Sequence, residues 1–461
     1  MLRVISEADR HGAARCNMAR GHSAKDMARN SSDRSSHAWL RGGRLHRRAV
    51  LTGLAATAAA TGALAQGQAE DPLQQLIQQN QSSSDGGQGF DAASRTIKMP
   101  KASLPTLTAQ NIPTTEAAIS RYEQIVAAGG WPHISDSDRL RLGARNPAVL
   151  ALRQRLKLSG DLDPSAVEND VYDSYVEAAV KRFQARHGVS PDGRPGALTI
   201  KALNIPADQR LSQLRTNLAR LRAFDTKAAP RFVVCNIPAA QLEAVENGVV
   251  ASRHIAVAGK PDRPSPELNS KIIEINFNPF WTVPVSIVRK DLIPKMQAEP
   301  DYLSRYHIRI LDQRNNELTP AQVNWFSEEA VNYRFKQDPG DHNSLGTIRI
   351  NFPSAHGVYM HDTPYKNLFG DDVRFDSSGC MRIQNVRDLV AWLLSETPGW
   401  SRIEIDDIIK SGERKDAKLK PPVPLHWIYI TAWATADGVV QFRDDIYNRD
   451  GLNPSATAQR G

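Results

Sequence analysis

The chain has 461 residues, of which 41% are hydrophobic and 23% are charged. This length exceeds one ordinary domain and the composition is that of a globular protein, which excludes a single small module, a fully disordered chain and a membrane bundle. The formal net charge is +8, but residues 1–65 hold 11 Lys and Arg against 4 Asp and Glu, which leaves 47 against 46 in the remainder. A nucleic-acid partner is therefore not expected.

Residues 1–65 are predicted to be an export signal. A basic, Ser-rich stretch ends in Arg47-Arg48, an uncharged run rich in Ala, Leu, Thr and Gly follows, and Ala63-Leu64-Ala65 offers a small-x-small cleavage pattern. The paired arginines resemble a twin-arginine signal, but their flanking residues match it incompletely, so the general secretory route stays open. An uncleaved anchor is the alternative, although the uncharged run is short and weakly apolar for a membrane span. We therefore expect no stable span after cleavage.

Helical patterns dominate the part of the chain that follows. Residues 66–98 are rich in Gln, Ser and Gly and predict a disordered linker. Residues 99–145 are predicted to be a helical N-terminal part of the scaffold, residues 146–206 a small helical domain with a third helix at 197–203, and residues 207–230 a helical connector. The apolar positions behind these helices are Val149, Leu150, Leu152 and Leu156, then Tyr175, Ala178, Ala179, Val180 and Phe183, and then Leu211, Leu214, Leu218 and Leu221.

Residues 231–450 are predicted to form a mainly β domain, which makes the whole a multi-domain α+β protein. Short β-branched or aromatic runs alternate there with Gly, Pro and Asn turns. The expected strands are 232–237, 253–258, 271–276, 347–351, 358–361 and 427–433.

Three further segments of this domain have distinct patterns. Residues 285–335 interrupt the strands with helical patterning around 287–296 and 320–333, so we expect a helical insertion that acts as a lid. The Lys-rich stretch 410–420 is expected to be mobile. A final hairpin is expected at Asp437-Gly438, and residues 451–461 are predicted to be a polar tail.

Two cysteines remain beyond the signal, so a disulfide framework is excluded. Cys235 lies in an apolar β-like run and is predicted to be core. Cys380 follows small residues, with Arg382 two positions later, which is a setting for a reactive thiolate. His361, at the end of an expected strand, is a candidate base, and the amides of Gly379 and Cys380 are candidate oxyanion donors. Each also has a structural interpretation; Arg382, for instance, could simply pair with Asp376 or Asp388.

Two resemblances to known families extend this interpretation. The run Ala179-Val180-Lys181-Arg182-Phe183-Gln184, with the His187-Gly188 and Asp192-Gly193 turns, resembles the small peptidoglycan-binding domain of bacterial cell-wall enzymes. The segment from about 232 to 447 resembles the catalytic domain of L,D-transpeptidases, and residues 66–461 resemble their long periplasmic Gram-negative type. The motifs of the second resemblance are Asn278-Pro279-Phe280-Trp281-Thr282-Val283-Pro284, Asn343-Ser344-Leu345-Gly346, Val358-Tyr359-Met360-His361-Asp362-Thr363-Pro364 and Ser377-Ser378-Gly379-Cys380-Met381-Arg382-Ile383.

The second resemblance implies roles for individual residues. It makes Cys380 the nucleophile and His361 its general acid and base, with His356 a weak rival. Gly379 would belong to the oxyanion site, and Tyr359 would be a neighbouring donor. The implied substrate-binding residues are Arg382, Trp281, Ser378 and Asn343. No metal or organic cofactor is implied, and no zinc-like ligand spacing occurs.

The implied activity is the cross-linking of peptidoglycan stem peptides. The thiolate would attack the carbonyl of the L-centre of diaminopimelate, release D-Ala, and pass the acyl group to the amine of another stem, which gives a three-to-three cross-link. Transfer to water or to a lipoprotein lysine is the alternative enzymatic outcome. A non-catalytic wall-binding protein is the alternative of another class. The expected protein is a monomer in the Gram-negative periplasm.

Overall fold

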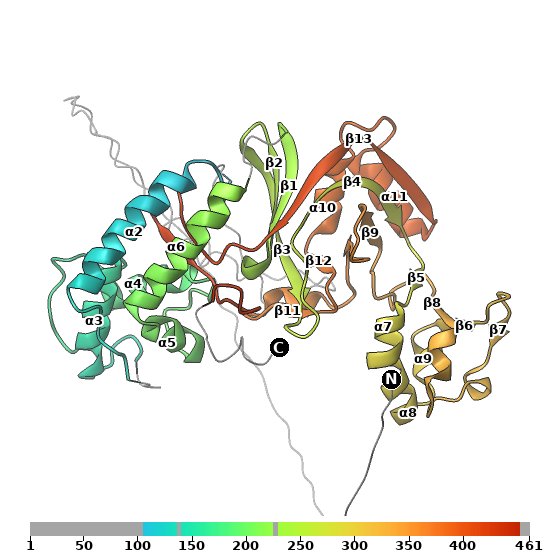
Figure 1. Ribbon diagram of the computed structural model, residues 1–461, viewed down its shortest axis with the longest axis horizontal. Coiled ribbons are helices and arrows are strands. Elements are labelled where there is room, and N and C mark those ends of the chain that lie inside the picture. Colours follow the sequence, from blue (N-terminus) through green and yellow to red (C-terminus); the bar gives the residue numbers. More distant parts are fainter. Residues whose placement is uncertain (1–104, 136–139, 225–228, 452–461) are drawn as a thin grey trace, which may run out of the picture. The chain divides into compact units, whose positions relative to one another are not determined.

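The computed structural model describes residues 105–135, 140–224 and 229–451 (Figure 1). The predicted export signal, the linker and nearly all of the predicted tail lie outside these residues. Within the described ranges the chain forms a helical region, a large β-sheet with two helices, and an insertion with a small sheet of its own. None of the helices in these ranges is long and apolar enough to cross a membrane.

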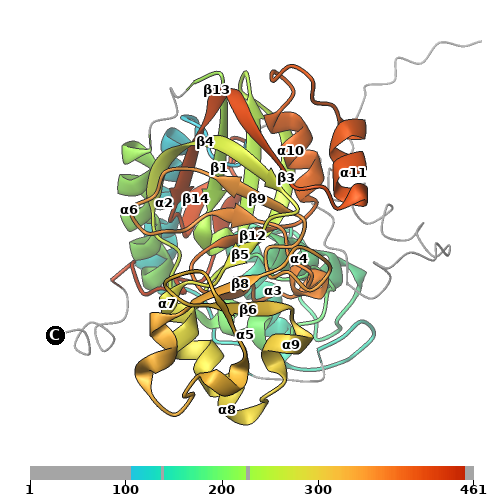
Figure 2. The same ribbon diagram turned by 90° about the vertical axis from the view of Figure 1, so that its right-hand side faces the viewer.

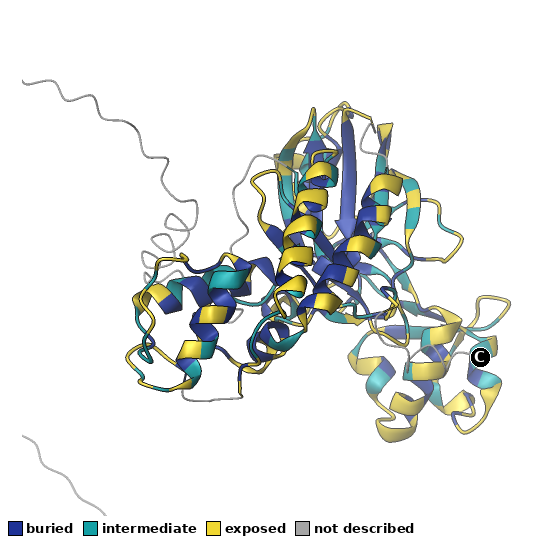
Figure 3. Cartoon of the chain, turned by 60° about the vertical axis from the view of Figure 1, so that its left-hand side comes forward, coloured by how far each residue is buried: buried dark blue, intermediate teal, exposed yellow. Residues whose placement is uncertain are grey.

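In residues 105–135 and 140–224, five helices precede the large sheet, close to where the apolar spacing predicts them. Their buried faces form continuous cores, whereas their outer faces are exposed (Figure 3). Two of the expected core positions are wrong: Leu150 is 42% exposed and Tyr175 is 73% exposed. The helices are α2 (Asn111–Ala127), α3 (Ala148–Ser159), α4 (Ser174–Arg186), α5 (Ala197–Asn204) and α6 (Ala207–Ala223).

Local sequence fixes the ends of α3 and α4. Helix α3 ends at Gly160, which has φ 82°, a conformation that glycine adopts without strain. Helix α4 begins after Asp173, whose carboxylate accepts a hydrogen bond from the Val176 amide. Phe183 of α4 and Leu203 of α5 then pack in one fully buried cluster. The predicted small helical domain is confirmed.

The large sheet has nine strands in the order β11-β3-β12-β10-β9-β4-β13-β1-β2. A further pairing of β2 with β3 closes eight of them into a barrel, with β11 attached outside the ring. Most neighbours are antiparallel, but β10 pairs with β12, β1 with β13 and β11 with β3 in parallel. The strands are β1 (Arg231–Asn236), β2 (Gln241–Glu246), β3 (Val249–Gly259), β4 (Leu268–Phe277), β9 (Ile348–Asn351), β10 (Met360–His361), β11 (Phe375–Ser377), β12 (Met381–Ile383) and β13 (Lys415–Ile428).

The core of the β region lies between this sheet and two helices, α10 (Val386–Leu393) and α11 (Arg402–Ser411) (Figure 2). Inward residues of the strands, such as Met360 and Met381, are completely buried there. Cys235 is also completely buried in this cluster, and burial raises the pKa of its thiol to about 12. The prediction that Cys235 is a core residue is therefore confirmed.

The insertion is an α+β unit rather than a helical one. Its elements are β5 (Trp281–Thr282), α7 (Val285–Ile287), a π turn (Val288–Leu292), α8 (Ile293–Ala298), α9 (Tyr302–Arg305), β6 (Ile308–Leu311), β7 (Glu317–Leu318) and β8 (Arg334–Gln337). The strands pair in the order β5-β8-β6-β7, and the unit has its own apolar cluster (Figure 1). The expected helix over 320–333 consists only of two short 3-10 turns, Pro320–Gln322 and Glu328–Asn332.

The expectation of a mobile Lys-rich segment is wrong. Helix α11 continues to Ser411, and β13 begins at Lys415 and pairs with β4. Ala417 and Leu419 are buried while Lys418 and Lys420 are exposed, so these two lysines occupy outward positions of an alternating strand. The expected strand 427–433 is also divided, because β13 ends at Ile428.

The C-terminal hairpin packs on the helical region. Strands β14 (Ala432–Ala434) and β15 (Val440–Phe442) pair around the predicted turn, and Figure 2 places β14 beside α2 and α6. The Thr431 amide donates to Asn217 Oδ1 at 2.8 Å, and Asn217 Nδ2 donates to Thr431 Oγ1 at 2.7 Å. The helices and this hairpin therefore share one core.

Candidate active site

The register of β10 and β12 brings the predicted catalytic residues together. Met360 pairs with Met381, His361 pairs with Arg382, and the Met381 amide donates to the Tyr359 carbonyl at 3.1 Å. Because side chains alternate along a strand, and both methionines face the core, the residues flanking them face the other way. Tyr359, His361, Cys380 and Arg382 therefore share one face, outside the core of the barrel.

The Cys380 thiol is protonated in the resting site. The side chain is partly buried, and burial raises the pKa of the thiol to about 11. A backbone hydrogen bond from Tyr359 and the charges of Arg349 and Arg382 lower this pKa without cancelling the effect of burial. Desolvation of the thiol therefore outweighs the effect of the neighbouring cations. The proton has to leave the thiol during the reaction.

His361 is buried and neutral. Its Nδ1 contacts the backbone carbonyl of Asp362, which can only accept, so Nδ1 carries the proton and Nε2 has the free lone pair. Burial, followed by the charge of Arg382, lowers the pKa of the imidazole to about 3. A neutral imidazole with a free Nε2 is nevertheless the form that accepts a proton.

A buried turn supports the backbone next to His361. The Asp362 carboxylate forms a salt bridge with Lys366 and accepts hydrogen bonds from the amide and hydroxyl of Thr347 at 3.1 and 3.0 Å. Gly346 has φ 59°, and a Cβ there would lie 2.5 Å from Asp362 Oδ2, so a side chain would displace the carboxylate. Gly346 therefore fits this position because it brings backbone against Asp362.

Asn343 belongs to this turn and not to the substrate face. Its side chain is completely buried, and Nδ2 donates to the carbonyls of Pro279 and Asp338 at 3.0 and 2.9 Å. Oδ1 accepts from the Leu345 amide at 2.8 Å. The expectation that Asn343 binds substrate is therefore corrected: its amide is fully used in holding the turn.

Tyr359 and Trp281 are in direct contact. Trp281 Nε1 donates to the Tyr359 hydroxyl at 3.2 Å, and Tyr359 meets the His361 ring edge-to-face with centroids 5.7 Å apart. Burial and the charge of Cys380 raise the pKa of the Tyr359 phenol, so it remains a neutral donor. Since Trp281 belongs to β5, the insertion reaches the candidate site at this point.

Arg349 is a site residue that the sequence analysis did not single out. It pairs with His361 across β9 and β10, and its guanidinium lies over the Tyr359 ring at 4.3 Å. Among the described residues its Nε has no hydrogen-bond partner. The sequence Ile348-Arg349-Ile350 could have indicated this residue. Side chains alternate along a strand, so an arginine between two core isoleucines faces away from the core.

Arg382 is only loosely paired. Its Nη1 lies 3.8 Å from Asp376 Oδ2, which matches one of the two structural alternatives, while Asp388 pairs with Arg402 instead. The side chain is 19% exposed, and burial lowers the pKa of the guanidinium. His356, the rival base, lies exposed on the preceding turn.

The loop before Cys380 is held by hydrogen bonds. Ser377 Oγ accepts from the Gly379 amide at 3.1 Å and donates to the Cys380 carbonyl at 2.6 Å. Gly379 has φ 109°, a conformation that favours glycine. Its amide is therefore already engaged, which leaves the Cys380 amide as the better oxyanion donor. Ser378 Oγ is also engaged, because it accepts from Arg263 Nη1 at 3.0 Å.

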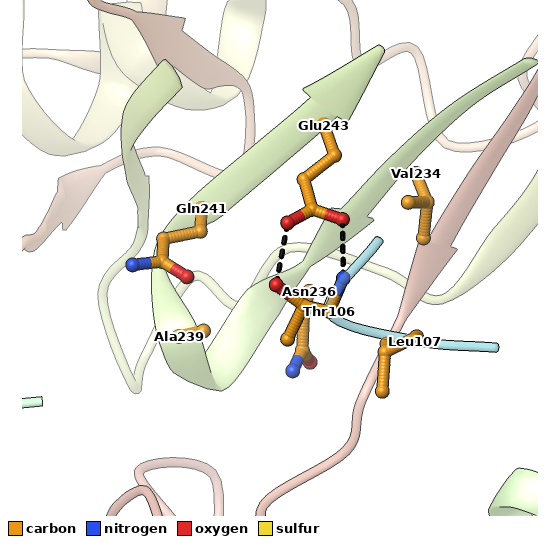
Figure 4. A pocket seen from close by; sticks show the side chains of 7 residues that line it. All are labelled: Thr106, Leu107, Val234, Asn236, Ala239, Gln241 and Glu243. Atoms are coloured by element: carbon orange, nitrogen blue, oxygen red, sulfur yellow. Dashed lines mark hydrogen bonds between the residues drawn. The ribbon is translucent and has the colours of Figure 1, made fainter. Parts of the chain in front are cut away.

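Outside this site, the described residues form a small cavity and contain no cluster of potential metal ligands. A small cavity beside β1 and β2 lies outside the predicted site, and the Thr106 amide donates there to the buried Glu243 carboxylate at 2.9 Å (Figure 4). Glu243 also pairs with Arg253, so it holds the incoming chain on the sheet. No group of three or more His, Cys, Asp or Glu side chains in residues 105–135, 140–224 and 229–451 is arranged to hold a metal ion.

A thiol and a neutral imidazole on one face are groups that a cysteine acyltransferase requires. Residues 230–405, which include every residue of this face, match the family model of the L,D-transpeptidase catalytic domain. Residues 145–203 match the model of a peptidoglycan binding domain. Two parts of the chain are therefore similar to known families, one to the L,D-transpeptidase catalytic domain and the other, which precedes it, to a peptidoglycan-binding domain.

Individual proteins show the same similarity. A Haemophilus influenzae protein whose name assigns it to the L,D-transpeptidases is 33% identical over 239 residues, which are 52% of this chain and 48% of that protein. The chain thus spans about half the length of this relative. Among solved structures, an L,D-transpeptidase from Stackebrandtia nassauensis is 12% identical, with 64% of this chain and 97% of that one covered and a TM-score of 0.23. One from Mycobacterium smegmatis is 13% identical, with 44% and 59% covered and a TM-score of 0.21. Such low TM-scores support no statement about the fold.

Proposed function

We propose that this protein is a peptidoglycan L,D-transpeptidase that forms three-to-three cross-links between stem peptides and releases D-Ala. The observation that carries the proposal is the common face of Tyr359, His361 and Cys380 on β10 and β12, inside the matched catalytic domain. That face offers a nucleophile, a base of fixed tautomer and a neutral phenol. These are the groups that acyl transfer through a thioester requires.

In the proposed mechanism the resting pair is neutral. As Cys380 Sγ attacks the donor carbonyl, its proton passes to His361 Nε2, and the Cys380 amide stabilises the oxyanion. The imidazolium then protonates the departing amine of D-Ala, and the C–N bond breaks to leave a thioester. The acceptor amine attacks this thioester and loses its proton to His361, which restores the thiol.

We propose that the cations on this face bind the carboxylates of the stem peptide. Arg382 and Arg349 lie beside the thiol, and Arg382 has only a distant acidic partner. Trp281 would line the donor side from the insertion, where its indole already meets Tyr359. Ser378 and Gly379 would contribute through their backbone, because Ser378 Oγ and the Gly379 amide have partners within the protein.

The remaining parts of the chain fit this activity. We propose that residues 1–65 are removed on export to the Gram-negative periplasm, that residues 66–98 are a linker, and that the helical domain retains the enzyme on the wall as a monomer. No cofactor is needed for the chemistry above.

The decisive experiment is incubation of the protein with a disaccharide tetrapeptide, followed by mass spectrometry. We expect a dimer that lacks one D-Ala. A tripeptide monomer would instead indicate transfer to water, and attachment of a lysine peptide would indicate a lipoprotein acceptor. If no product forms and Cys380 is never acylated, the protein is a wall-binding protein and the proposal is wrong.

The insertion is proposed to close over the donor stem. Trp281 of β5 contacts Tyr359. Asp291 of the insertion contacts Arg263, whose guanidinium also contacts Ser378. Replacing residues 285–335 with a short Gly/Ser bridge should reduce transfer far more than it reduces alkylation of Cys380 by a small reagent. Unchanged transfer in a folded variant would contradict the lid.

A further inference from the structure

The segment between β3 and β4 carries one arginine that contacts two separate parts of the molecule. Arg263 Nη1 and Nη2 bind the Asp291 carboxylate at 2.5 and 3.0 Å, which is a bidentate pair. The same Nη1 donates to Ser378 Oγ at 3.0 Å. Asp291 belongs to the π turn of the insertion, whereas Ser378 lies two residues before the nucleophile. The Arg263 and Asp291 side chains are only 20% and 35% exposed.

The backbone around Arg263 is fixed independently of the insertion. Ser265 Oγ donates to the Gly379 carbonyl and accepts from the Gly259 amide, both at 2.9 Å. A Cβ on Gly259 would lie 2.2 Å from the Arg263 carbonyl, so the segment approaches the end of β3 closely. The Tyr447 hydroxyl also donates to the Gly259 carbonyl at 2.6 Å. This segment therefore supports the loop of Cys380 from one side while Arg263 extends to the insertion.

We propose that Arg263 is a positioning residue that couples the insertion to the nucleophile loop, with Asp291 as its partner on the insertion. While Asp291 holds the guanidinium, Ser378 Oγ keeps its donor and the loop from 377 to 380 keeps its conformation. When the insertion moves away, Arg263 either moves with Asp291 or loses its ion pair with Asp291. In both cases Ser378 Oγ loses the hydrogen-bond donor that the ion pair held in place. The geometry of the nucleophile thus depends on the position of the insertion.

The π turn gives this contact a local cause. In a regular α-helix the same i→i+4 hydrogen-bond pattern would continue from α7 into α8. The wider π turn at Val288–Leu292 interrupts this pattern and changes the direction in which its side chains, including Asp291, project. Neighbouring Arg289 forms an ion pair with Glu328 inside the insertion, with both side chains more than half exposed. That pair has the same charges but no contact with the site, so Arg289 is a matched control.

A purely structural ion pair predicts a different behaviour. A partly exposed pair contributes little to stability, and its loss would leave the Cys380 loop as it was. A positioning pair changes the loop itself. The effects of removing Arg263 and Asp291 should then not be additive, because each change breaks the same connection.

The test measures the loop directly and the reaction separately. Deuterium uptake by the peptide that contains Ser378 is compared in the wild type, Arg263→Ala, Arg263→Lys, Asp291→Asn, the double variant Arg263→Ala/Asp291→Asn and the control Arg289→Ala. We expect faster uptake in Arg263→Ala and Asp291→Asn, a similar effect in the double variant, a smaller one in Arg263→Lys and none in Arg289→Ala. Uptake equal to wild type in Asp291→Asn, or an equal change in Arg289→Ala, would overturn the proposal.

The second readout rests on the proposed function. Acylation of Cys380 by a stem tetrapeptide should fall about tenfold to a hundredfold in kcat for Arg263→Ala, because the nucleophile is displaced. Alkylation by iodoacetamide should change by less than about twofold, since the small reagent needs no aligned loop. If the wild type is not acylated at all, the proposed function fails while the deuterium result still decides the role of Arg263.

Discussion

Two buried histidines, His361 in the catalytic region and His187 after α4 in the helical region, have nearly the same local chemistry. In both, Nδ1 contacts a backbone carbonyl, which is that of Asp362 for His361 and that of Phe183, at 2.7 Å, for His187. Burial, followed by a neighbouring arginine, lowers the pKa of each imidazole. Both rings are therefore neutral at physiological pH, with the same tautomer.

The difference lies in what surrounds the free nitrogen. The His187 ring stacks on Phe183 at 3.8 Å and on Phe442 at 5.5 Å, and its Nε2 is buried with no hydrogen-bond partner in the described part of the chain. His361 shares its face with a thiol and a phenol. A fixed tautomer thus leaves a nitrogen free to accept a proton. The histidine can act as a general base only where a proton donor lies within reach of that nitrogen.

Removing the thiol is the strongest test of this comparison. Cys380→Ala should abolish cross-linking and also the covalent adduct with a carbapenem, whose strained amide is similar to the acyl donor. Cys235→Ala should retain both, because Cys235 is enclosed in the barrel core. Intact-mass spectrometry and product analysis measure the two effects. Equal loss in both folded variants would refute the assignment of the nucleophile.

Replacing each of the two histidines separately is the next test. His361→Ala should slow acylation by about 10²- to 10⁴-fold, because general-base help is lost. His187→Gln should leave the rate within about twofold, since its ring serves only packing and a backbone contact. Stopped-flow acylation with a chromogenic β-lactam gives these rates. His356→Ala serves as an exposed control, and a slower reaction in that variant would show that His361 is not the base.

The pH dependence of Cys380 alkylation tests the neutral resting pair. With the pKa of the thiol at about 11, the thiolate fraction and the rate of reaction with iodoacetamide should rise about tenfold per pH unit from pH 7 to pH 9. A rate that is already constant over this range would mean that a thiolate and an imidazolium exist before substrate binds. The Cys235→Ala background keeps the measurement to one thiol.

The smallest effect concerns stability in acid. The folded-state pKa of His361 is about 3 and its unfolded value about 6.5, so the unfolded chain binds the extra proton between these values. Stability is therefore complete above about pH 6.5 and decreases as the pH falls towards 3, by about 2 kcal/mol at pH 5 for this one group. His187 should act in the same direction. Urea unfolding at pH 7 and pH 5 measures the loss, and His187→Gln should reduce it; an undiminished loss in that variant would show that His187 does not contribute.

Sequence spacing predicted the helices well, because the apolar periodicity of α3, α4 and α6 is intrinsic to one segment. Strand β12 was not predicted, because its three residues are too short a run to show an alternating pattern. The first half of strand β13 was not predicted, because its only buried residues, Ala417 and Leu419, lie among exposed lysines.

Properties that depend on distant partners could not be predicted. The pKa values of Cys380 and His361 follow from burial, which the whole barrel creates. Asn343 has the residue type of a substrate ligand, and only the positions of Pro279 and Asp338 reveal that its amide is already used. Arg263 lies in an unremarkable loop sequence, and its two contacts come from segments 28 and 115 residues away.

The shared core of the helices and the C-terminal hairpin sets an order of events during synthesis. Ala118, Tyr122 and Leu214 pack with Ala434 and Phe442, and the Asn111 side chain donates to the Ala434 carbonyl at 2.6 Å, 323 residues later. The helical region therefore lacks part of its interior until the last strand has left the ribosome. Closing so long a loop costs little more than closing a shorter one, but it makes folding slow. A nascent chain stopped before residue 432 would expose this apolar surface, so the core shared by α2 and α6 is complete only after residues 432–442 have been synthesised.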